Sequence, residues 1–391
     1  MGIDIERVRA ETPGCEHVIH FNNSGAALMP APVIEALHDH LDLEARIGGY
    51  EAEREAAGAL EHTYDALADL LHCDPGEIAV VENATVAWES AFYGLPFERG
   101  DRILTTTAEY ASNYIAYLQL VQRRGIDVAV VPDDEDGQID VSALESMIDE
   151  RVRLISITHV PTNGGLVNPA AEVGRVAREA GVPFLLDACQ SVGQMPLDVE
   201  AIGCDMLSGT GRKFLRGPRG TGFLYVRRAF LETLEPPVLD LHSAEWTAPD
   251  AYEMRPDARR FENWENYVAG KVALGVAVDY ALGLGLENIR ERIGGLAEDF
   301  RSRLGTLPGV TVRDLGSERC GIVSFTVEGA DHEALIGRLS ERGINCSRSP
   351  RRYTRLDMER RGLADLIRAG VHYYNTGQEV ERFIAALHEI I

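Results

Sequence analysis

The chain has 391 residues, 45% of them hydrophobic and 26% charged, a composition typical of a globular protein with a large buried core. Its 62 acidic residues outnumber the 38 basic ones and give a formal net charge of −24. A field of that sign repels polyanions, so the composition excludes nucleic acid and an anionic membrane as partners.

The first 72 residues are predicted to be mainly helical. The opening stretch MGIDIERVRAETPGCEHV lacks the basic-then-apolar order of a signal peptide, so we expect the chain to be cytoplasmic. Apolar residues recur at helical spacing over 31–47 and 53–72, which predicts a helix in each range. No apolar run anywhere in the sequence approaches about 18 residues, so no membrane-spanning helix is expected.

Short apolar runs then alternate with helical segments. Five of them predict buried strands: 77–83, 101–110, 127–134, 151–160 and 182–190. Between the last two, Asn168 is expected to cap a helix that starts at Pro169 and stops at Gly181. Strands and helices that alternate at this rhythm predict an α/β fold with a largely parallel sheet.

A glycine-rich, basic turn follows, within a predicted hairpin between DMLSG and TGFLYVRR. The turn GTGRKFLRGPRGTG spans 209–222 and holds five glycines and four cations, in a chain that is acidic overall. One of the four is Lys213, and the only other lysine among the 38 basic residues is Lys271. Lysine differs from arginine because its amine can become neutral and act as a nucleophile.

Beyond about residue 255 the pattern changes to longer helices. Helical spacing runs through 266–307 and predicts one long connecting helix, followed by a strand over 321–329 and two further helices. We therefore expect a large domain at 15–255 with a mostly parallel sheet, and a smaller α+β domain at 256–391 that includes residues 1–14.

The six cysteines are scattered along the chain and form no CxxC pair. This spacing predicts neither a zinc site nor a disulfide framework, so no metal is expected. Free thiols are typical of a reducing compartment, which again favours the cytoplasm.

Polar residues gather where the predicted strands end, which is the edge at which open α/β sheets bind ligands. The first such strand leads into a helix at Ala84 and Thr85, whose backbone N–H groups can receive an anion. Later strand ends contribute Thr162, Asn163, Asp187, Gln190, Ser208, Thr210, Arg212 and Lys213. A buried carboxylate such as Asp187 needs a partner, because an unpaired buried charge is costly.

One cofactor requires this set of groups. Pyridoxal 5'-phosphate (PLP) is carried as a Schiff base on a lysine amine, with an acidic residue at its pyridine nitrogen. Its phosphate is bound by hydroxyls, a helix N-terminus and an arginine. Lys213 and Asp187, with the groups around them, therefore predict a PLP enzyme that acts on an α-amino acid.

The stretches HVPTNGGLVNP, FLLDACQSVGQ and SGTGRKFLRGPRGTGFLYV resemble the class V aminotransferase family, which includes cysteine desulfurases and isopenicillin N epimerase. The resemblance extends from FNNSGAALMP to RAGVHYYNTGQEVERF, which is nearly the whole chain. It implies fold type I, the aspartate aminotransferase-like fold of PLP-dependent transferases, and a homodimer.

The resemblance also implies roles for individual residues. Lys213 would carry the cofactor and remove the Cα proton, and Asp187 would pair with the pyridine nitrogen. Arg368 is similar to the arginine that binds the substrate carboxylate, with Asn163 also at the substrate. The other implied cofactor contacts are Ala84, Thr85, Thr210 and Arg212 at the phosphate, Gln190 at the ring hydroxyl, Tyr110 stacked on the ring, and Thr162.

Three stretches depart from the family pattern. Desulfurases carry a nucleophilic cysteine on a loop that corresponds to 343–357, where this chain has only Cys346, which we interpret as structural. The segment RRFENWENY places Trp264 and Glu265 where the family has a threonine for the phosphate of the partner subunit. The basic stretch 348–355 is either a solvated loop or a recognition site for a second anionic group on the substrate.

The reaction type stays open at this point. Cα deprotonation is common to transamination, β-elimination and epimerisation, and the missing loop cysteine argues against a persulfide on the enzyme. An aminotransferase and a cysteine-type C–S lyase are the leading alternatives, followed by an amino-acid epimerase. The remaining alternative is a non-catalytic anion-binding protein, although the turn lacks the P-loop pattern GxxxxGK[ST].

Overall fold

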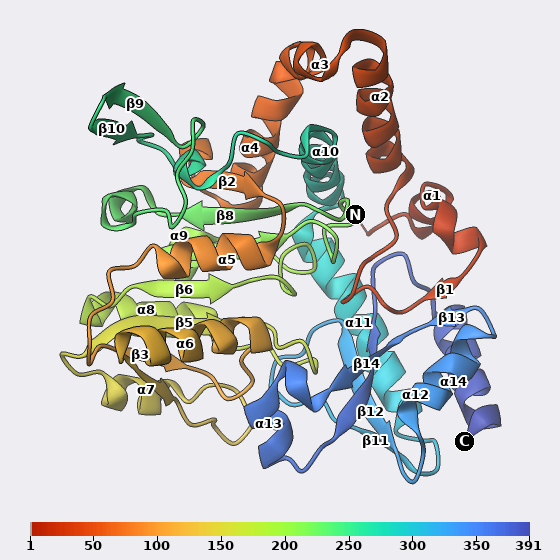
Figure 1. Ribbon diagram of the computed structural model, residues 1–391. Coiled ribbons are helices and arrows are strands. Elements are labelled where there is room, and N and C mark those ends of the chain that lie inside the picture. The colour runs from red at the N-terminus through yellow and green to blue at the C-terminus, as the bar shows by residue number, and fades with distance from the viewer. Residues whose placement is uncertain (1) are drawn as a thin grey trace.

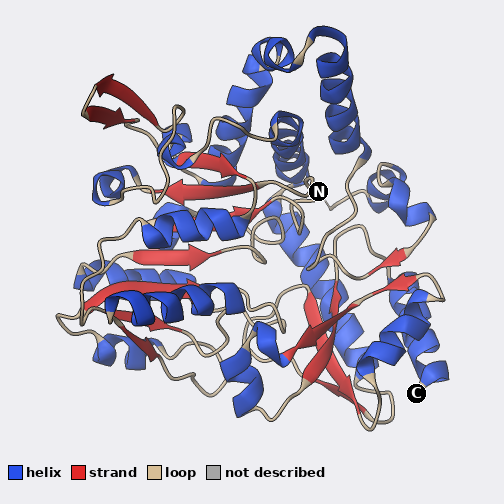
Figure 2. Cartoon of the chain, in the orientation of Figure 1, coloured by secondary structure: helices blue, strands red, loops and turns tan. Residues whose placement is uncertain are grey.

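The computed structural model describes residues 2–391 (Figure 1). Most strands belong to two sheets, one of seven strands and one of four, and two further sheets have two strands each (Figure 2). The α-helices are α1 (Ile5–Ala10), α2 (Ala31–Ile47), α3 (Gly49–Glu55), α4 (Ala57–Leu71), α5 (Ala84–Tyr93), α6 (Ala111–Arg124), α7 (Val141–Met147), α8 (Ala170–Ala180), α9 (Val199–Ile202), α10 (Val268–Leu284), α11 (Leu286–Leu304), α12 (His332–Ser340), α13 (Arg355–Arg360) and α14 (Gly377–Ile390).

The seven-stranded sheet has the order β2-β8-β7-β6-β5-β3-β4. Its strands are β2 (Ile78–Val81), β3 (Arg102–Thr105), β4 (Asp127–Val130), β5 (Val152–Thr158), β6 (Phe184–Asp187), β7 (Met206–Thr210) and β8 (Gly222–Val226). Neighbouring strands are parallel except at β8, which is antiparallel to β2 and β7. The predicted α/β class with a mostly parallel sheet is confirmed.

Helices cover both faces of this sheet, because side chains on its central strands alternate between two apolar cores. Leu185 of β6 and Met206 of β7 pack in a core with α5 and α6, which lie across the near face in Figure 1. Leu186 and Leu207, the next residues on those strands, pack in a core with α4, α8 and α10. Since both faces are covered, polar side chains of the sheet collect at the strand ends.

The four-stranded antiparallel sheet has the order β11-β12-β15-β14. Its strands are β11 (Val310–Val312), β12 (Ile322–Val327), β14 (Ser347–Pro350) and β15 (Asp365–Gly370). Strands β12 and β15 pack in a core with α11, α12 and α14. The N-terminal segment joins this part, because β1 (Ile19–His20) pairs with β13 (Ile344–Asn345). The remaining strands, β9 (Ala244–Ala248) and β10 (Ala251–Met254), form a hairpin that projects from the body in Figure 1. The domain boundaries expected from the sequence stay a prediction.

The prediction of a single connecting helix over 266–307 is wrong. Two helices, α10 and α11, are bent by 78° where they meet at Gly285, which has a φ of +81° that favours glycine. The helix expected over 53–72 is likewise interrupted, at Ala56 between α3 and α4. No single helix within residues 2–391 is long and apolar enough to cross a membrane, and only the bent α10–α11 pair reaches that length and composition together.

The expected cap of α8 is also wrong. The helix begins at Ala170 with Pro169 in the cap position. Asn168 makes tertiary contacts instead: its Oδ1 accepts the Ile139 N–H at 3.1 Å and its Nδ2 donates to the Thr158 carbonyl at 2.8 Å. Asn168 therefore connects the end of β5 to the loop at Ile139 instead of capping α8.

Candidate active site

A pocket lies at the carboxyl ends of β5, β6 and β7 and at the N-terminus of α5, and the space inside it, open solvent included, is about 500 Å³. Nine of the predicted site residues line it: Ala84, Thr85, Tyr110, Thr162, Asp187, Gln190, Thr210, Arg212 and Lys213. The parallel strands explain this convergence, because their carboxyl ends share one edge of the sheet.

Four further residues line the cavity without having been predicted: Asn83, Thr158, Val160 and Cys189. Conversely, the predicted substrate residues Asn163 and Arg368 lie outside the lining. Asn163 turns its amide to Asp357 of α13, at 2.7 Å. Its expected role at the substrate stays a prediction.

One end of the cavity is suited to an anion. Asn83 caps α5 by accepting the Val86 N–H at 3.0 Å, and Ala84 and Thr85 open the helix with backbone N–H groups that have no partner within it. Strand β8 passes so close that a Cβ at Gly222 would lie 2.5 Å from the Asn83 carbonyl carbon. Glycine at 222 therefore lets the strand and the helix N-terminus form this cradle.

Arg212 lines the same cavity, but its guanidinium is held on one side. Nη1 donates to the Gly25 carbonyl, and the Arg212 carbonyl accepts the Ala27 N–H at 2.9 Å. These bonds attach the N-terminal segment around residue 25 to the glycine-rich turn. The charge of Arg212 is thus fixed at the cavity wall, where a phosphate or a substrate anion can use it.

Asp187 is 4% exposed and accepts only neutral donors. Its Oδ1 accepts the Cys189 N–H at 2.9 Å and its Oδ2 accepts Asn113 Nδ2 at 3.0 Å. No cation pairs with it among residues 2–391. A buried carboxylate with this environment fits a cationic ring nitrogen as its missing partner.

Lys213 is half-buried in the lining, and its side-chain amine forms no hydrogen bond or ion pair among the residues that the structure describes. Burial lowers the pKa of Lys213 to about 8, and the neighbouring charge of Arg212 acts in the same direction. A solitary amine with a depressed pKa is the group that attacks a carbonyl carbon.

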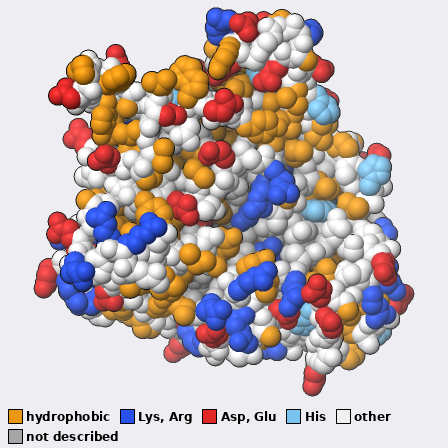
Figure 3. All heavy atoms as spheres, in the orientation of Figure 1, with side chains coloured by type: hydrophobic (Ala, Val, Ile, Leu, Met, Phe, Trp, Pro, Cys, Tyr) orange, Lys and Arg blue, Asp and Glu red, His pale blue; other side chains and the backbone are white. Residues whose placement is uncertain are grey.

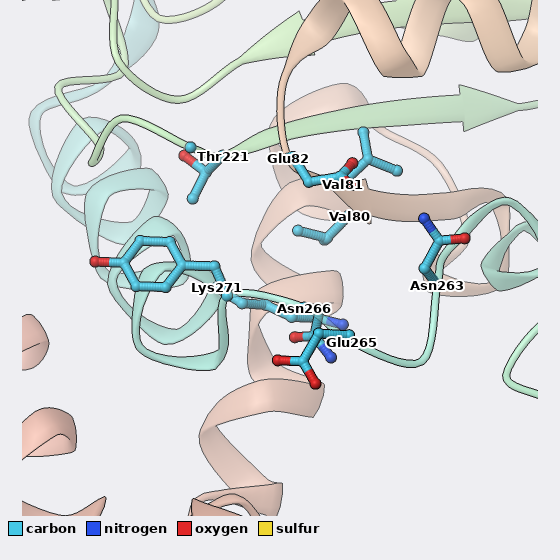
Figure 4. A pocket seen from close by; sticks show the side chains of 10 residues that line it. Val80, Val81, Glu82, Thr221, Asn263, Glu265, Asn266 and Lys271 are labelled. Carbon is cyan, nitrogen blue, oxygen red and sulfur yellow. The ribbon is translucent and has the colours of Figure 1, made fainter.

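The other lysine is committed elsewhere. Lys271 of α10 pairs with Glu262 at 3.0 Å and also donates to Tyr64. It lines a separate hollow of about 360 Å³, which Figure 4 shows with Glu265 and Asn266 around it. Of the two lysines, only Lys213 lines the larger cavity.

Figure 4 also shows Asn263, Glu265 and Asn266, which belong to the segment that departs from the family pattern. Glu262 anchors this segment to the edge strand β2, since its Oε1 accepts the Val80 N–H at 2.8 Å. Glu265 then lines the hollow, not the cavity that holds Lys213, and Trp264 is 55% exposed. Within its own chain, Glu265 therefore does not face the anion cradle.

Arg368 stands behind the cavity wall. From β15 its Nη1 donates to Thr162 Oγ1 at 2.6 Å and to the Thr162 carbonyl at 2.8 Å, and its Nε donates to Ser347. Burial lowers the pKa of Arg368 to about 10.

Gln190 donates to the Ser24 carbonyl at 3.1 Å, and its buried Oε1 has no partner within residues 2–391. That orphaned acceptor fits a hydroxyl group of a bound cofactor.

The basic stretch 348–355 is partly neutralised by nearby acids. Arg348 pairs with Asp365 at 2.5 Å and with Glu333 at 2.7 Å, and Arg355 pairs with Glu359 at 2.7 Å. These pairs favour the solvated-loop interpretation for those two arginines.

One charged residue near the cavity was missed. Glu109 is buried and accepts the Tyr110 N–H at 2.8 Å and Asn113 Nδ2 at 3.0 Å. The signal in the sequence was that Glu109 is the one charged residue in TTTAEYASN, directly after an apolar strand.

The chain is similar to known proteins in sequence and in fold. The profile of the family described as Aminotransferase class-V matches residues 19–383. A probable cysteine desulfurase of Methanothermobacter thermautotrophicus is 29% identical over 391 residues, which cover 98% of this chain and 98% of that protein.

Solved structures are similar over the same extent. The apo structure of a cysteine desulfurase from Thermococcus onnurineus NA1 superposes with a TM-score of 0.93 at 28% identity, covering 100% of this chain and 98% of the other. A cystine C–S lyase in complex with its reaction product cysteine persulfide superposes with a TM-score of 0.87 at 25% identity, covering 97% and 99%.

Proposed function

Since the chain belongs to the class V aminotransferase family and is a PLP-dependent enzyme, we propose that it breaks the Cβ–S bond of a cysteine-type amino acid by β-elimination, without an enzyme thiol as sulfur acceptor. Cystine or cysteine is the expected substrate. This choice decides between the lyase and the aminotransferase that the sequence left open.

The proposal rests on the burial and the raised thiol pKa of two cysteines. Cys346, the one cysteine near the position of a desulfurase nucleophile, is buried in the core of the four-stranded sheet, and burial raises its pKa to about 12. Cys189 lines the cavity, but burial first and then Asp187 raise its pKa well above the ordinary value. A thiol must ionise to attack sulfur, so neither is suited to accept it.

The cavity has the groups to hold the cofactor. We assign Lys213 to its covalent attachment, Asp187 to the ring nitrogen, Gln190 to the ring hydroxyl, and Tyr110 to a ring face. Ala84, Thr85, Thr210 and Arg212 would bind the phosphate, and Thr162 completes the wall. When bound, PLP supplies an electron sink for the pair of electrons left at Cα.

The residues of the chain then handle the substrate. Arg368 is assigned to the α-carboxylate, reached beside Thr162, and the neutral amine of Lys213 takes the Cα proton. The electron pair of the Cα–H bond forms Cα=Cβ while the sulfur leaves with the electrons of the Cβ–S bond. Water hydrolyses the released enamine to pyruvate and ammonium, and the sulfur departs as sulfide from cysteine or as cysteine persulfide from cystine.

Product analysis tests the proposal. Purified protein with added PLP is incubated with L-cystine, L-cysteine and L-alanine, and pyruvate and sulfur products are followed without any keto-acid acceptor. We expect pyruvate and persulfide or sulfide in equal amounts from cystine or cysteine, and loss of at least about 10³-fold in Lys213→Ala, since it removes both attachment and base.

A matched variant separates the lyase from a desulfurase. Cys346→Ala is expected to keep pyruvate formation within about twofold, because the thiol is buried in an apolar core. Alanine formed from cysteine, or a tenfold loss in folded Cys346→Ala, would point to a desulfurase. Conversion of PLP to the pyridoxamine form would point to an aminotransferase.

We also propose that the enzyme is a cytoplasmic homodimer. Large aromatic side chains are exposed on and near the projecting hairpin: Trp246, Tyr252, Trp264 and Tyr267. Figure 3 shows hydrophobic side chains gathered over this upper part of the molecule, as at surfaces that bind another protein. A second copy of the chain is the expected partner, and the mass of one chain in light scattering would contradict this.

All six cysteines are free thiols, which supports the proposed location in the cytoplasm.

A further inference from the structure

Glu109 is a buried carboxylate to which the reaction proposed above gives no task. It is 3% exposed and directly precedes Tyr110, the cap residue of α6. Its Oε2 accepts Thr105 Oγ1 at 2.9 Å, and its Oε1 accepts the Tyr110 N–H at 2.8 Å as well as the Thr158 hydroxyl. Within residues 2–391 it forms no ion pair, so all its partners are neutral.

Asn113 joins Glu109 to Asp187. Asn113 Nδ2 lies 3.0 Å from Glu109 Oε1 and 3.0 Å from Asp187 Oδ2, and the two N–H bonds of one amide group can serve one carboxylate each. Asn113 is itself 3% exposed. Two buried carboxylates therefore share one neutral donor.

The pair is electrostatically costly because no cation forms an ion pair with either carboxylate within residues 2–391. Burial raises the pKa of Glu109 to about 7 against the hydrogen bond from Thr158, and the charge of Asp187 adds to the rise. The other titratable group that faces Glu109 is Tyr117 of α6, whose pKa burial raises well above its ordinary value, so it stays neutral. A cation placed beside Asp187 would favour the ionised form of both carboxyls, because it attracts both negative charges.

We propose that Glu109 is a positioning residue for the cofactor: through Asn113 it orients the Asp187 carboxylate and adds a second negative charge that keeps the ring nitrogen of bound PLP protonated. The same carboxylate holds the Tyr110 N–H, so it also positions a side chain of the lining. This inference rests on the proposed PLP site.

The apoprotein provides the first test. Carbon-13 NMR of glutamate-labelled apoprotein is expected to show one carboxyl that titrates near pH 7, because burial raises the pKa of Glu109 to about 7. That signal should be absent from Glu109→Gln and should move to lower pH when PLP is added, because the ring cation favours the ionised form. A Glu109 signal that titrates at the ordinary pH, or does not respond to PLP, overturns the proposal.

The second test follows the ring nitrogen itself, with PLP labelled with nitrogen-15. Glu109→Gln is expected to lower the pH midpoint of ring deprotonation by at least one unit and to weaken PLP binding about tenfold, which corresponds to one pKa unit. Asn113→Ser should have a smaller effect in the same direction, because it removes the link to Asp187 but leaves the charge of Glu109. The two single effects should not be additive in the double variant, because both variants break the same contact. If Glu109→Gln does not fold, Asn113→Ser alone decides the question.

Glu89→Gln is the matched control, since burial also raises the pKa of that carboxyl on α5 but it does not line the cavity. It should leave the midpoint and the affinity unchanged. A midpoint that stays within 0.3 units in folded Glu109→Gln, or that moves equally in Glu89→Gln, overturns the proposal. Failure of the wild-type protein to bind PLP would instead remove the proposed function on which it rests.

Discussion

Lys213 owes its reactivity to its surroundings. An ordinary lysine is almost entirely protonated at neutral pH, whereas burial and Arg212 lower the pKa of Lys213 to about 8. About a tenth of it is therefore a free amine at pH 7, roughly 200- to 300-fold more than for an exposed lysine. The cavity thus prepares the amine before any ligand arrives.

The rate at which the apoprotein captures PLP should follow this pKa. The neutral amine is the reacting form and its fraction grows as pH rises, so we expect the rate constant to increase about tenfold per pH unit below 8 and to level off above it. Stopped-flow absorbance measures it, and Lys213→Arg should show no covalent capture. A profile that keeps rising beyond pH 10 would mean that the lysine is not depressed.

At the scale of elements, a buried cluster attaches the segment after η4 (Ala258–Phe261) to the edge of the large sheet. Glu262 accepts the Val80 N–H of β2, the Tyr64 hydroxyl of α4 and the Lys271 ammonium of α10. An edge strand leaves backbone groups unpaired, and here a carboxylate satisfies one of them. The cluster fixes where Glu265 and Trp264 emerge, although neither reaches the cavity of its own chain.

Removing this carboxylate should be costly. Glu262→Gln leaves Lys271 as an uncompensated buried charge, so we expect it to lower the free energy of unfolding by about 3–5 kcal/mol. Replacing both partners, as Glu262→Leu with Lys271→Met, should cost less than the single change. Urea unfolding of the three proteins measures this, and equal losses in the single and double variants would refute the argument.

The carboxyl of Glu262 should also make the stability of the protein depend on pH in acid. Although burial alone would raise it, His242 at 3.5 Å, the positive charge of Lys271 and hydrogen bonds from Val80 and Tyr64 lower the pKa of Glu262 to about 2. A carboxyl with a depressed folded pKa stabilises the fold above its ordinary pKa, and this stability is lost as pH falls from about 4.5 toward 2. Glu262→Gln should therefore unfold with a shallower dependence on pH across that window.

On the scale of the whole molecule, Arg216 joins parts of the chain that are distant in sequence. It is 1% exposed and adopts a φ of +61° within the glycine-rich turn. Its guanidinium donates to the Leu28 carbonyl at 2.7 Å, Thr12 Oγ1 at 2.6 Å and the Tyr373 hydroxyl at 2.9 Å, and it lies 4.6 Å from the Tyr374 ring. The turn that carries Lys213 is thereby fastened to both ends of the chain.

Arg216→Gln is expected to lower the free energy of unfolding by about 3 kcal/mol, since it removes buried charge-assisted hydrogen bonds and ring contacts at once. It should also weaken PLP binding, because Lys213 is three residues away on the same turn. Arg219→Gln is the control in the same turn and, being exposed, should change stability by no more than about 0.5 kcal/mol. Similar effects of the two variants, in denaturant titrations, would contradict the role given to Arg216.

Much of the architecture was predictable, because its signals are local. The helix at 31–47 has the bounds expected from its apolar spacing, and each of the five predicted strand ranges contains a strand of the large sheet. Asp187, Gln190 and Lys213 could be placed in one site because parallel strands end at a common edge. Periodicity continued across Gly285, however, so the bend between α10 and α11 was not predicted.

The α/β class, the family and the residues that converge on the cavity follow from the sequence, since these depend on periodicity and on residue types at strand ends. Which cations are available and which carboxylates are paired follows only from the folded structure. Lys271 is neutralised by Glu262, Asn163 is turned to Asp357, and Asn113 links Asp187 to Glu109. Pairing and burial set the charge and pKa of a group, and they depend on residues that only folding brings together.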